Sequence, residues 1–278
     1  AETGNLEEVK TLIEFETPVN IQDSHEDTPV HLAVRNGHTE VVNFLIENGA
    51  DLEIINNAFF TPLYTAVLIN NPEMCRLLIK KGADLNKRDG FRISPLQKAS
   101  ERGYLEIINI LIENGADLED KSEYFGKPLL LAAYGHHNKA CKILIEAGAT
   151  PDERDMNGRT SLHAAANGRN FKLAKYLVEI GAEVNAKDHE ETVPLHYCAR
   201  SDSVEICKLL IENGAEIDAK DIRNQTPLHI ASSTGRLKAV QFLVENGADV
   251  NAQDEHERTP LDVAKGEDIR NFLEKQNS

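Results

Sequence analysis

Apolar side chains recur along this chain in short blocks that have the spacing of one helical face. In the stretch 39–48, Val41, Val42 and Leu45 fall on one side of a helix, and Gly49 follows directly. Glycine commonly ends a helix because it readily adopts the positive φ of the C-terminal cap. The pattern therefore predicts short amphipathic helices that end at glycine.

A second helix is predicted before each such block. Thr28 and Pro29 make a favourable helix start, because a threonine oxygen caps free backbone N–H groups and proline suits the first helical position. The segments after the glycines, such as 51–54, 183–186 and 249–252, are too short for another helix and have the character of the extended arm of a turn. The chain is expected to consist of helix pairs joined by turns.

A six-residue pattern returns every 33 residues without insertion or deletion. It begins at Thr28 as Thr-Pro-Val-His-Leu-Ala, and its copies occupy residues 28–33, 61–66, 94–99, 127–132, 160–165, 193–198, 226–231 and 259–264. A Gly-Ala pair returns at the same period, starting at residues 49, 82, 115, 148, 181, 214 and 247. Since one helix pair cannot bury its own apolar face, neighbouring copies are expected to stack into a solenoid.

The motif, its period and the Gly-Ala pairs resemble the ankyrin-repeat family, whose signature is Thr-Pro-Leu-His-x-Ala. The resemblance covers essentially the whole chain. It implies an all-α repeat solenoid of stacked ankyrin repeats, each a helix-turn-helix with a projecting β-turn finger. The departures are local: Lys127, Ser161 and Val193 interrupt the motif, and its histidine is replaced by Tyr64, Gln97, Leu130 and Asp262.

The period also sets the expected domain organisation, a single ankyrin-repeat domain over residues 1–278. If each unit begins at the Asp position of the finger, seven full repeats lie between partial repeats at both ends. Counting the partial first repeat as repeat one, the full repeats two to eight are 23–55, 56–88, 89–121, 122–154, 155–187, 188–220 and 221–253.

The two end repeats are expected to differ from the others. Residues 1–22 supply only the second helix of repeat one, with Leu6, Val9, Leu12 and Ile13 apolar, so we expect the chain to come from a longer one or to have lost earlier residues. Residues 254–278 form a shortened repeat nine. Its second helix has the polar outer face of a cap, with Glu267, Asp268, Arg270, Asn271, Glu274 and Lys275.

Composition narrows the functional classes. The chain has 46 acidic and 30 basic side chains and a formal charge of −16. This argues against nucleic acid as a partner, because binding there rests on neutralising phosphates with Lys and Arg. No run of 18 apolar residues is present, so membrane insertion is not expected, and the first residues lack the basic and apolar regions of a secretory signal. An intracellular protein, cytoplasmic or nuclear and monomeric in isolation, is predicted.

The four cysteines are interpreted as structural. Cys75, Cys141 and Cys207 occupy one position in alternate repeats, where other repeats have Val or Ile, so a small buried apolar role is expected. Stacked helices lie about 8–10 Å apart, which places cysteines of alternate repeats beyond disulfide reach. Cys198 replaces the motif alanine and is expected to be buried too. This usage fits a reducing compartment.

No catalytic, metal or cofactor site is predicted. His137 and Cys141 have helical spacing, but a zinc site needs three or four ligands. Gly-rich phosphate loops and the Gly-x-Ser-x-Gly nucleophile motif are absent from the sequence. The acids recur on solvated faces without an enclosed cleft that would raise a pKa. The motif histidines are expected to hydrogen-bond the helix start to the finger backbone, and they are His31, His163, His196 and His229.

Aromatic residues gather where the resemblance implies partner binding, on the concave side made of fingers and inner helices. Eight of the 15 aromatics fall between residues 59 and 134, about twice the number that even spreading gives. Several occupy fingers, where Asn, Asp, Gly or Ser is usual. We predict a protein-binding hot spot on repeats three to five, formed by Phe59, Phe60, Leu68, Ile69, Phe91, Tyr104, Tyr124, Phe125 and Tyr134. The alternative is that these rings fold inward and pack the fingers together.

Charge is distributed unevenly. Residues 23–55 contain seven acidic side chains and one basic, residues 56–88 contain two and five, and residues 188–220 contain eight and three. If the acidic fingers recognise a partner, it should carry a basic segment. The alternative is that these charges are simply solvated. The candidate electrostatic contacts are Asp27, Arg35, Lys87, Arg88, Arg102, Glu190 and Glu191.

Together these observations predict a non-catalytic scaffold that binds another protein or peptide. Three other classes stay open. The chain could be a docking or sensor domain of a larger enzyme or channel, or an effector or toxin module of a host-associated organism. A third class is small-anion binding, with Lys87, Arg88 and Arg154 available for phosphate. The framework serves unrelated roles, so the sequence does not name the partner.

Overall fold

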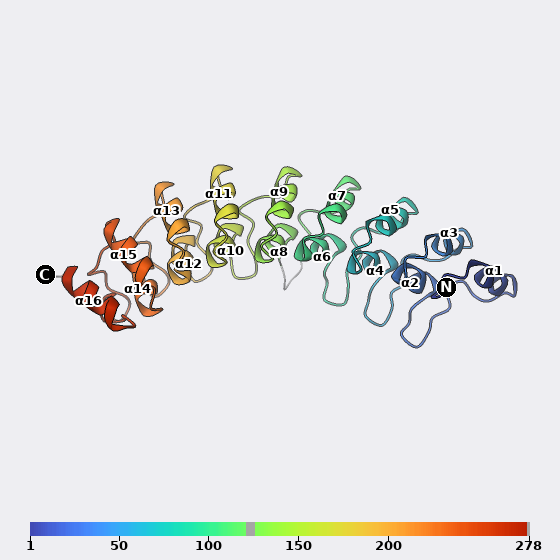
Figure 1. Ribbon diagram of the computed structural model, residues 1–278, viewed down its shortest axis with the longest axis horizontal. Coiled ribbons are helices and arrows are strands. Elements are labelled where there is room, and N and C mark those ends of the chain that lie inside the picture. Colours follow the sequence, from blue (N-terminus) through green and yellow to red (C-terminus); the bar gives the residue numbers. More distant parts are fainter. Residues whose placement is uncertain (121–125, 277–278) are drawn as a thin grey trace. The chain divides into compact units, whose positions relative to one another are not determined.

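The computed structural model describes residues 1–120 and 126–276, and its regular elements in those residues are sixteen α-helices (Figure 1). The chain divides into two compact units, Ala1–Ala149 and Thr150–Ser278. Each predicted full repeat contains one pair of helices, so the predicted all-α repeat architecture is confirmed. The assignment of the whole chain to a single domain stays a prediction.

In the first unit a single helix is followed by four pairs, each consisting of a first helix and a second helix. First helices contact one another along the unit, and most successive second helices do the same. The fingers project beside the first helices (Figure 1). The elements are α1 (Leu6–Glu14), α2 (Pro29–Arg35), α3 (Thr39–Glu47), α4 (Pro62–Leu68), α5 (Pro72–Lys80), α6 (Pro95–Arg102), α7 (Leu105–Glu113), α8 (Pro128–Tyr134) and α9 (Asn138–Glu146).

The second unit has three such pairs and a terminal helix. Its elements are α10 (Ser161–Asn167), α11 (Phe171–Glu179), α12 (Pro194–Ser201), α13 (Val204–Glu212), α14 (Pro227–Ser233), α15 (Leu237–Glu245) and α16 (Glu267–Gln276). The core of each unit lies between first and second helices, where the small motif alanine, such as Ala231, packs with a fully buried leucine, such as Leu243.

The first residue of each described finger organises the turn that follows it. In repeat seven, Asp188 Oδ1 accepts the backbone N–H groups of Glu190 and Thr192, both at 2.9 Å. This Asx turn explains why the position favours Asp or Asn. Several acids predicted as solvated charge therefore serve the backbone instead. Equivalent pairs of bonds are made by Asp23, Asn56, Asp89, Asp155, Asp221 and Asp254.

The motif histidine joins its own helix start to the next finger. Nδ1 of His163 accepts the backbone N–H of Thr160 at 3.0 Å, and Nε2 therefore carries the proton that it donates to the Thr192 carbonyl at 3.0 Å. Burial lowers the pKa of His163 to about 4, which keeps the ring neutral. The predicted histidine role is confirmed, and the same pair of bonds is made by His31, His196 and His229.

Two substitutes for that histidine preserve the link to the next finger. Gln97 accepts the backbone N–H of Ser94 at 2.9 Å and donates to the Gly126 carbonyl at 2.7 Å. The hydroxyl of Tyr64 donates to the Asp89 carboxylate at 2.7 Å. The finger is thus tied to the helix by a different side chain where the motif is broken.

Repeat nine differs from the full repeats before it. Residues 260–263 form turns in place of a first helix, and the Asp262 carboxylate accepts the backbone N–H of Thr259 at 2.8 Å. On α16, Ile269 and Leu273 are buried, whereas the charged residues of the helix are exposed. The predicted polar outer face of this helix is confirmed.

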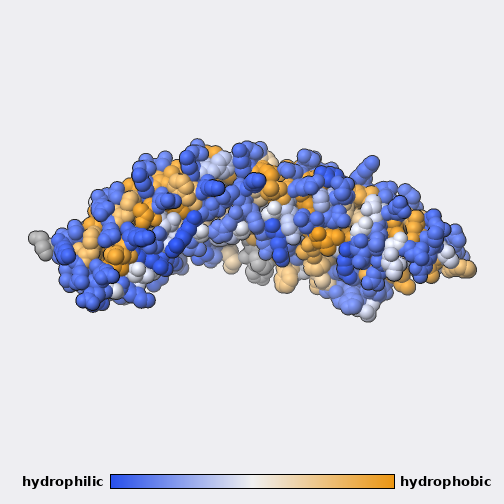
Figure 2. Space-filling view, viewed as in Figure 1, coloured by the Kyte–Doolittle hydropathy of each residue, from blue (hydrophilic) through white to orange (hydrophobic). Residues whose placement is uncertain are grey.

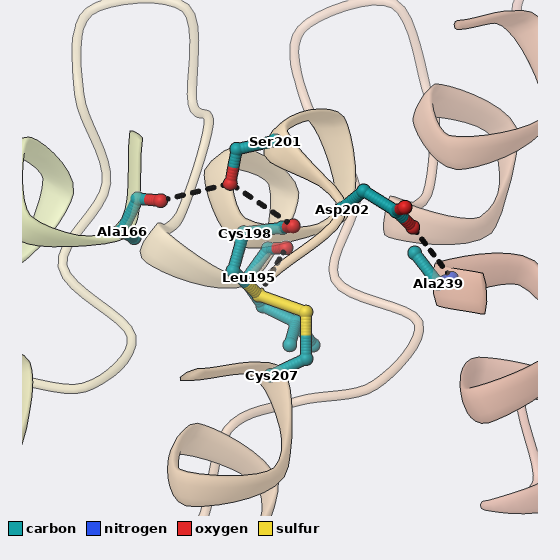
Figure 3. Close-up of a disulfide and its surroundings, with 7 residues drawn as sticks. All are labelled: Ala166, Leu195, Cys198, Ser201, Asp202, Cys207 and Ala239. Atoms are coloured by element: carbon teal, nitrogen blue, oxygen red, sulfur yellow. Dashed lines mark hydrogen bonds between the residues drawn. A yellow bond between two sulfur atoms is a disulfide. The ribbon is translucent and has the colours of Figure 1, made fainter. Parts of the chain in front are cut away.

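The cysteine prediction is wrong for one pair, because Cys198 and Cys207 form a disulfide (Figure 3). They lie on α12 and α13, the antiparallel helices of repeat seven, with their Cα atoms 5.6 Å apart. The counterparts of Cys207 in alternate repeats are beyond disulfide reach, but the motif position that faces Cys207 in its own repeat is not. Cys75 and Cys141 are free and buried as predicted, and burial raises the pKa of both thiols to about 12.

Thiol counting tests this disulfide. With dithionitrobenzoate in denaturant and without reductant, two of the four cysteines should react, because only Cys75 and Cys141 are free. After reduction, all four should react. The Cys198→Ala variant serves as the control and should show three thiols without reductant, since it releases Cys207. Four reactive thiols in the unreduced wild-type protein would contradict the pairing.

Candidate functional site

Two aromatic rings occupy neighbouring fingers of the first unit. Phe59 is 54% exposed and Phe91 is 70% exposed. A Cβ atom placed on Gly90 would lie 2.7 Å from the Phe59 ring, so this ring covers the glycine backbone of the next finger. Phe59 also has a φ of 63°, which a phenylalanine adopts at some cost. We call Phe59 and Phe91 the fingertip pair. In the space-filling view the surface is mostly hydrophilic, with hydrophobic patches interspersed (Figure 2).

Phe60 has a supporting position instead. It is half-buried, and its ring stacks on Tyr64 with centroids 5.0 Å apart and an interplanar angle of 14°. Tyr64 itself is only 1% exposed, and the Phe60 carbonyl accepts the hydrogen bond of His31. For Phe60 the structure therefore corresponds to the packing interpretation of the finger aromatics.

The remaining predicted hot-spot residues do not join the fingertip pair. Ile69 and Tyr134 are 39% and 40% exposed, and both lie where a first helix ends. The fingers precede the other end of these helices, about 10 Å away for a helix of seven residues. The other predicted residues are half-buried at Leu68 and Tyr104, while Tyr124 and Phe125 lie outside the described residues.

The predicted charged contacts include one internal pair. Asp27 is 2% exposed and accepts from Arg35 at 2.6 Å and from the Asn56 side chain at 2.8 Å. This carboxylate therefore ties a finger to its helix and its neighbouring finger. Arg35 is held by the same bond.

The other charged candidates differ in their surroundings. Arg88 pairs with the buried carboxylate of Asp120, and Arg154 donates to the Gly158 carbonyl at 3.1 Å, so both arginines named for a small anion have internal contacts. Glu191 accepts from Lys187 at 2.9 Å. Lys87 is half-buried, whereas Arg102 and Glu190 are exposed.

A polar pocket of about 350 Å³ lies in the second unit and was missed by the sequence reasoning. It is lined by fingers of repeats six to eight and by the first helix α12, including Arg159, Tyr197, Arg200 and Arg223. Tyr197 is 7% exposed and donates to the Asp188 carboxylate at 2.7 Å. The available signal was Tyr197 at the variable position of the motif, where the other copies carry no aromatic side chain.

Two features are absent from the described residues, a metal-binding cluster and a membrane-spanning helix. No group of three or more His, Cys, Asp or Glu side chains in them is arranged to hold a metal ion. None of their helices combines the length and the apolar character needed to cross a bilayer. The arrangement of these side chains does not test whether the protein uses a metal or cofactor, so that predicted absence stays a prediction.

Comparison with known proteins identifies a matching family and a solved structure of similar fold. The family model described as ankyrin repeats in three copies matches residues 1–56, 50–122, 96–188, 129–221 and 188–254. A search of curated proteins finds no match. Among solved structures, the crystal structure of the human ASB11 ankyrin repeat domain is similar to this chain, with a TM-score of 0.71 and 24% identity. The match covers 80% of this chain and 99% of that one, and at this identity it shows the fold.

Proposed function

The chain belongs to the ankyrin-repeat family, and from this premise we propose that it holds a partner protein against the fingers of its first unit. Ankyrin repeats are generally protein–protein interaction modules and are typically non-catalytic. We place the fingertip pair, Phe59 and Phe91, at the centre of the interface with the partner. The chain then acts as a scaffold without catalysis of its own.

The exposure of the fingertip pair carries this proposal. Phe91 leaves 70% of its surface in water, and Phe59 leaves 54% although its backbone has a φ that glycine would adopt more readily. Neither ring is needed to form a finger, because repeat six has Asn157 and Gly158 at the same two positions. Two exposed rings on adjacent fingers match the aromatic anchors that dominate binding at protein interfaces.

Two further parts of the proposal concern the charge of the partner and the location of the protein. The net charge of −16 favours a partner that carries a basic segment, since complementary charge raises association rates. The prediction of an intracellular, monomeric protein stands beside an opposing observation, the disulfide between Cys198 and Cys207. Disulfides are rare in reducing compartments, so the thiol count above also bears on location.

The sharpest test exchanges the fingertip pair for residues that the chain already uses. Phe59→Gly and Phe91→Asn copy Gly158 and Asn157 of repeat six. We expect the double variant to bind the partner at least tenfold more weakly, because aromatic hot spots are worth about 2 kcal/mol or more. The partner is first identified by photo-crosslinking in native cells from position 58, the exposed finger residue next to Phe59. Affinity is then measured with both purified proteins.

Met156→Ser provides the matched control. Met156 is 56% exposed on a finger of the second unit, so this variant removes apolar surface outside the proposed interface. It should bind the partner as the wild type does. The thermal unfolding midpoint of the double variant should stay close to the wild-type value. A large loss of stability would instead support packing of the fingers, and unchanged affinity would refute the proposed interface.

A further inference from the structure

The pocket of the second unit is built around a fixed tyrosine. The Tyr197 hydroxyl is held by Asp188, and its ring meets that of His163 edge to face at 5.3 Å. The guanidinium carbons of Arg159 and Arg200 each lie 5.8 Å from the centre of the Tyr197 ring. Cation–π attraction of this kind positions a guanidinium group. The tyrosine thus places two positive charges at a pocket in a protein of net negative charge.

The acids buried in the wall of the pocket already accept hydrogen bonds. Asp188 accepts two backbone N–H groups and the Tyr197 hydroxyl, and Asp221 accepts the backbone N–H groups of Arg223 and Gln225 at 2.9 and 2.7 Å. Both are less than 10% exposed. The third acid, Glu190, is exposed at a fingertip. Two of the three lining carboxylates therefore serve the turns of their own fingers.

Repeat two contains a carboxylate that this pocket lacks. Arg35 is the counterpart of Arg200, and it pairs with Asp27 at 2.6 Å. The counterpart of Asp27 in repeat seven is Thr192, so Arg200 has no carboxylate at that position. Within the described residues, the salt bridges of the second unit include neither Arg200 nor Arg223, and both side chains are exposed.

We propose that this pocket receives the carboxylate of an Asp or Glu side chain in a peptide segment of a partner protein. The incoming carboxylate takes the role that Asp27 has in repeat two and pairs with Arg200, while Arg223 approaches from the next finger. An arginine fork matches two carboxylate oxygens, which favours this group over a neutral amide. A volume of about 350 Å³ admits one such side chain with a few waters.

This inference goes beyond the proposed function, because it concerns the second unit and a chemically defined contact. It shares with that proposal only the premise that the chain binds proteins. The fingertip pair belongs to the first unit, so either site can fail its test while the other passes.

Nuclear magnetic resonance detects the weak binding that one side chain supports. The full chain, labelled with ¹⁵N, is titrated with the tripeptide acetyl-Gly-Glu-Gly-amide, and the Nε–H signals of Arg200 and Arg223 are followed. We expect saturable shifts with the glutamyl peptide and none with the matched peptide acetyl-Gly-Gln-Gly-amide. Equal shifts with both peptides would overturn the proposal, since they would show that charge is not recognised.

Variants assign the effect to the pocket. Arg200→Gln should weaken binding at least tenfold, and Arg223→Gln should weaken it to a smaller extent. Arg169→Gln is the control, because Arg169 is an exposed arginine of repeat six that does not line the pocket. The unfolding midpoint of each variant confirms that it is folded. Wild-type affinity in Arg200→Gln, or equal loss in Arg169→Gln, would refute the assignment.

Two further measurements distinguish a carboxylate site in this pocket from a phosphate site and from binding at the fingertip pair. A peptide with phosphoserine in place of glutamate should bind no more tightly, and binding of the phosphoserine peptide alone would overturn the carboxylate assignment. The Phe59→Gly and Phe91→Asn double variant should bind the glutamyl peptide as the wild type does. Loss of binding there would contradict the location of the site in the second unit.

Discussion

Replacement of His163 by alanine is expected to lower the free energy of unfolding by about 3 to 5 kcal/mol. The side chain is fully buried and bonds two backbone groups, the Thr160 N–H and the Thr192 carbonyl. Alanine leaves both groups without a partner and leaves a cavity beside them, and each defect is costly in a dry interior. Urea unfolding followed by circular dichroism measures the loss.

Glutamine at the same position should restore most of that stability. Gln97 of repeat four already spans the corresponding gap, with bonds of 2.9 Å to the Ser94 N–H and 2.7 Å to the Gly126 carbonyl. His163→Gln is therefore expected to cost less than about half as much as His163→Ala, because it keeps the hydrogen bonds and much of the volume. Equal destabilisation by the two substitutions would show that the bonds between helix and finger contribute little.

Acidification from about pH 6.5 to pH 4 is expected to destabilise the folded protein progressively. The pKa of His31, His163 and His196 is lowered in the folded state by burial, and that of His163 lies at about 4. Over this range the unfolded chain binds more protons than the folded chain, so stability falls as the pH falls. For His163 the change from 6.5 to about 4 amounts to about 3 kcal/mol.

His163→Gln separates this effect from other titrations. The variant lacks one of the titrating rings, so its urea midpoint should fall less steeply than that of the wild type between pH 6.5 and 4.5. Asp23 and Asp262 contribute outside this window, because backbone hydrogen bonds hold their pKa below 3.8. Identical pH profiles for the two proteins would contradict the assignment to His163.

The roles of the motif residues followed from their spacing. The Thr28–Pro29 start and the glycines after the second helices predicted where helices begin and end, and the structure has helices in those places. The histidine bonds were also predicted, since a side chain that returns every 33 residues meets the same neighbours in each repeat. The period was therefore sufficient to predict the helix starts, the helix ends and the histidine hydrogen bonds.

The candidate surface was predictable only in part. The sequence predicted that Phe59 and Phe91 lie on fingers, and both are exposed in the structure. The sequence prediction also included Phe60, whose ring instead stacks on Tyr64. Adjacent residues on a tight turn point in different directions, and composition does not record which one faces water. The same limit applied to Asp27, which was predicted as a surface contact and is a buried carboxylate paired with Arg35 in the structure.

The amino-acid sequence by itself determined the family, the helix pairs and the stacking, because a unit of 33 residues that cannot bury its own core requires neighbours of the same structure. The tertiary structure decided which side chains meet across that stack. Cys198 reaches Cys207 because antiparallel helices of one repeat bring their Cα atoms to 5.6 Å. Arg200 lines a pocket because three fingers meet near Tyr197. The spacing of residues along the chain does not predict which side chains of different fingers meet.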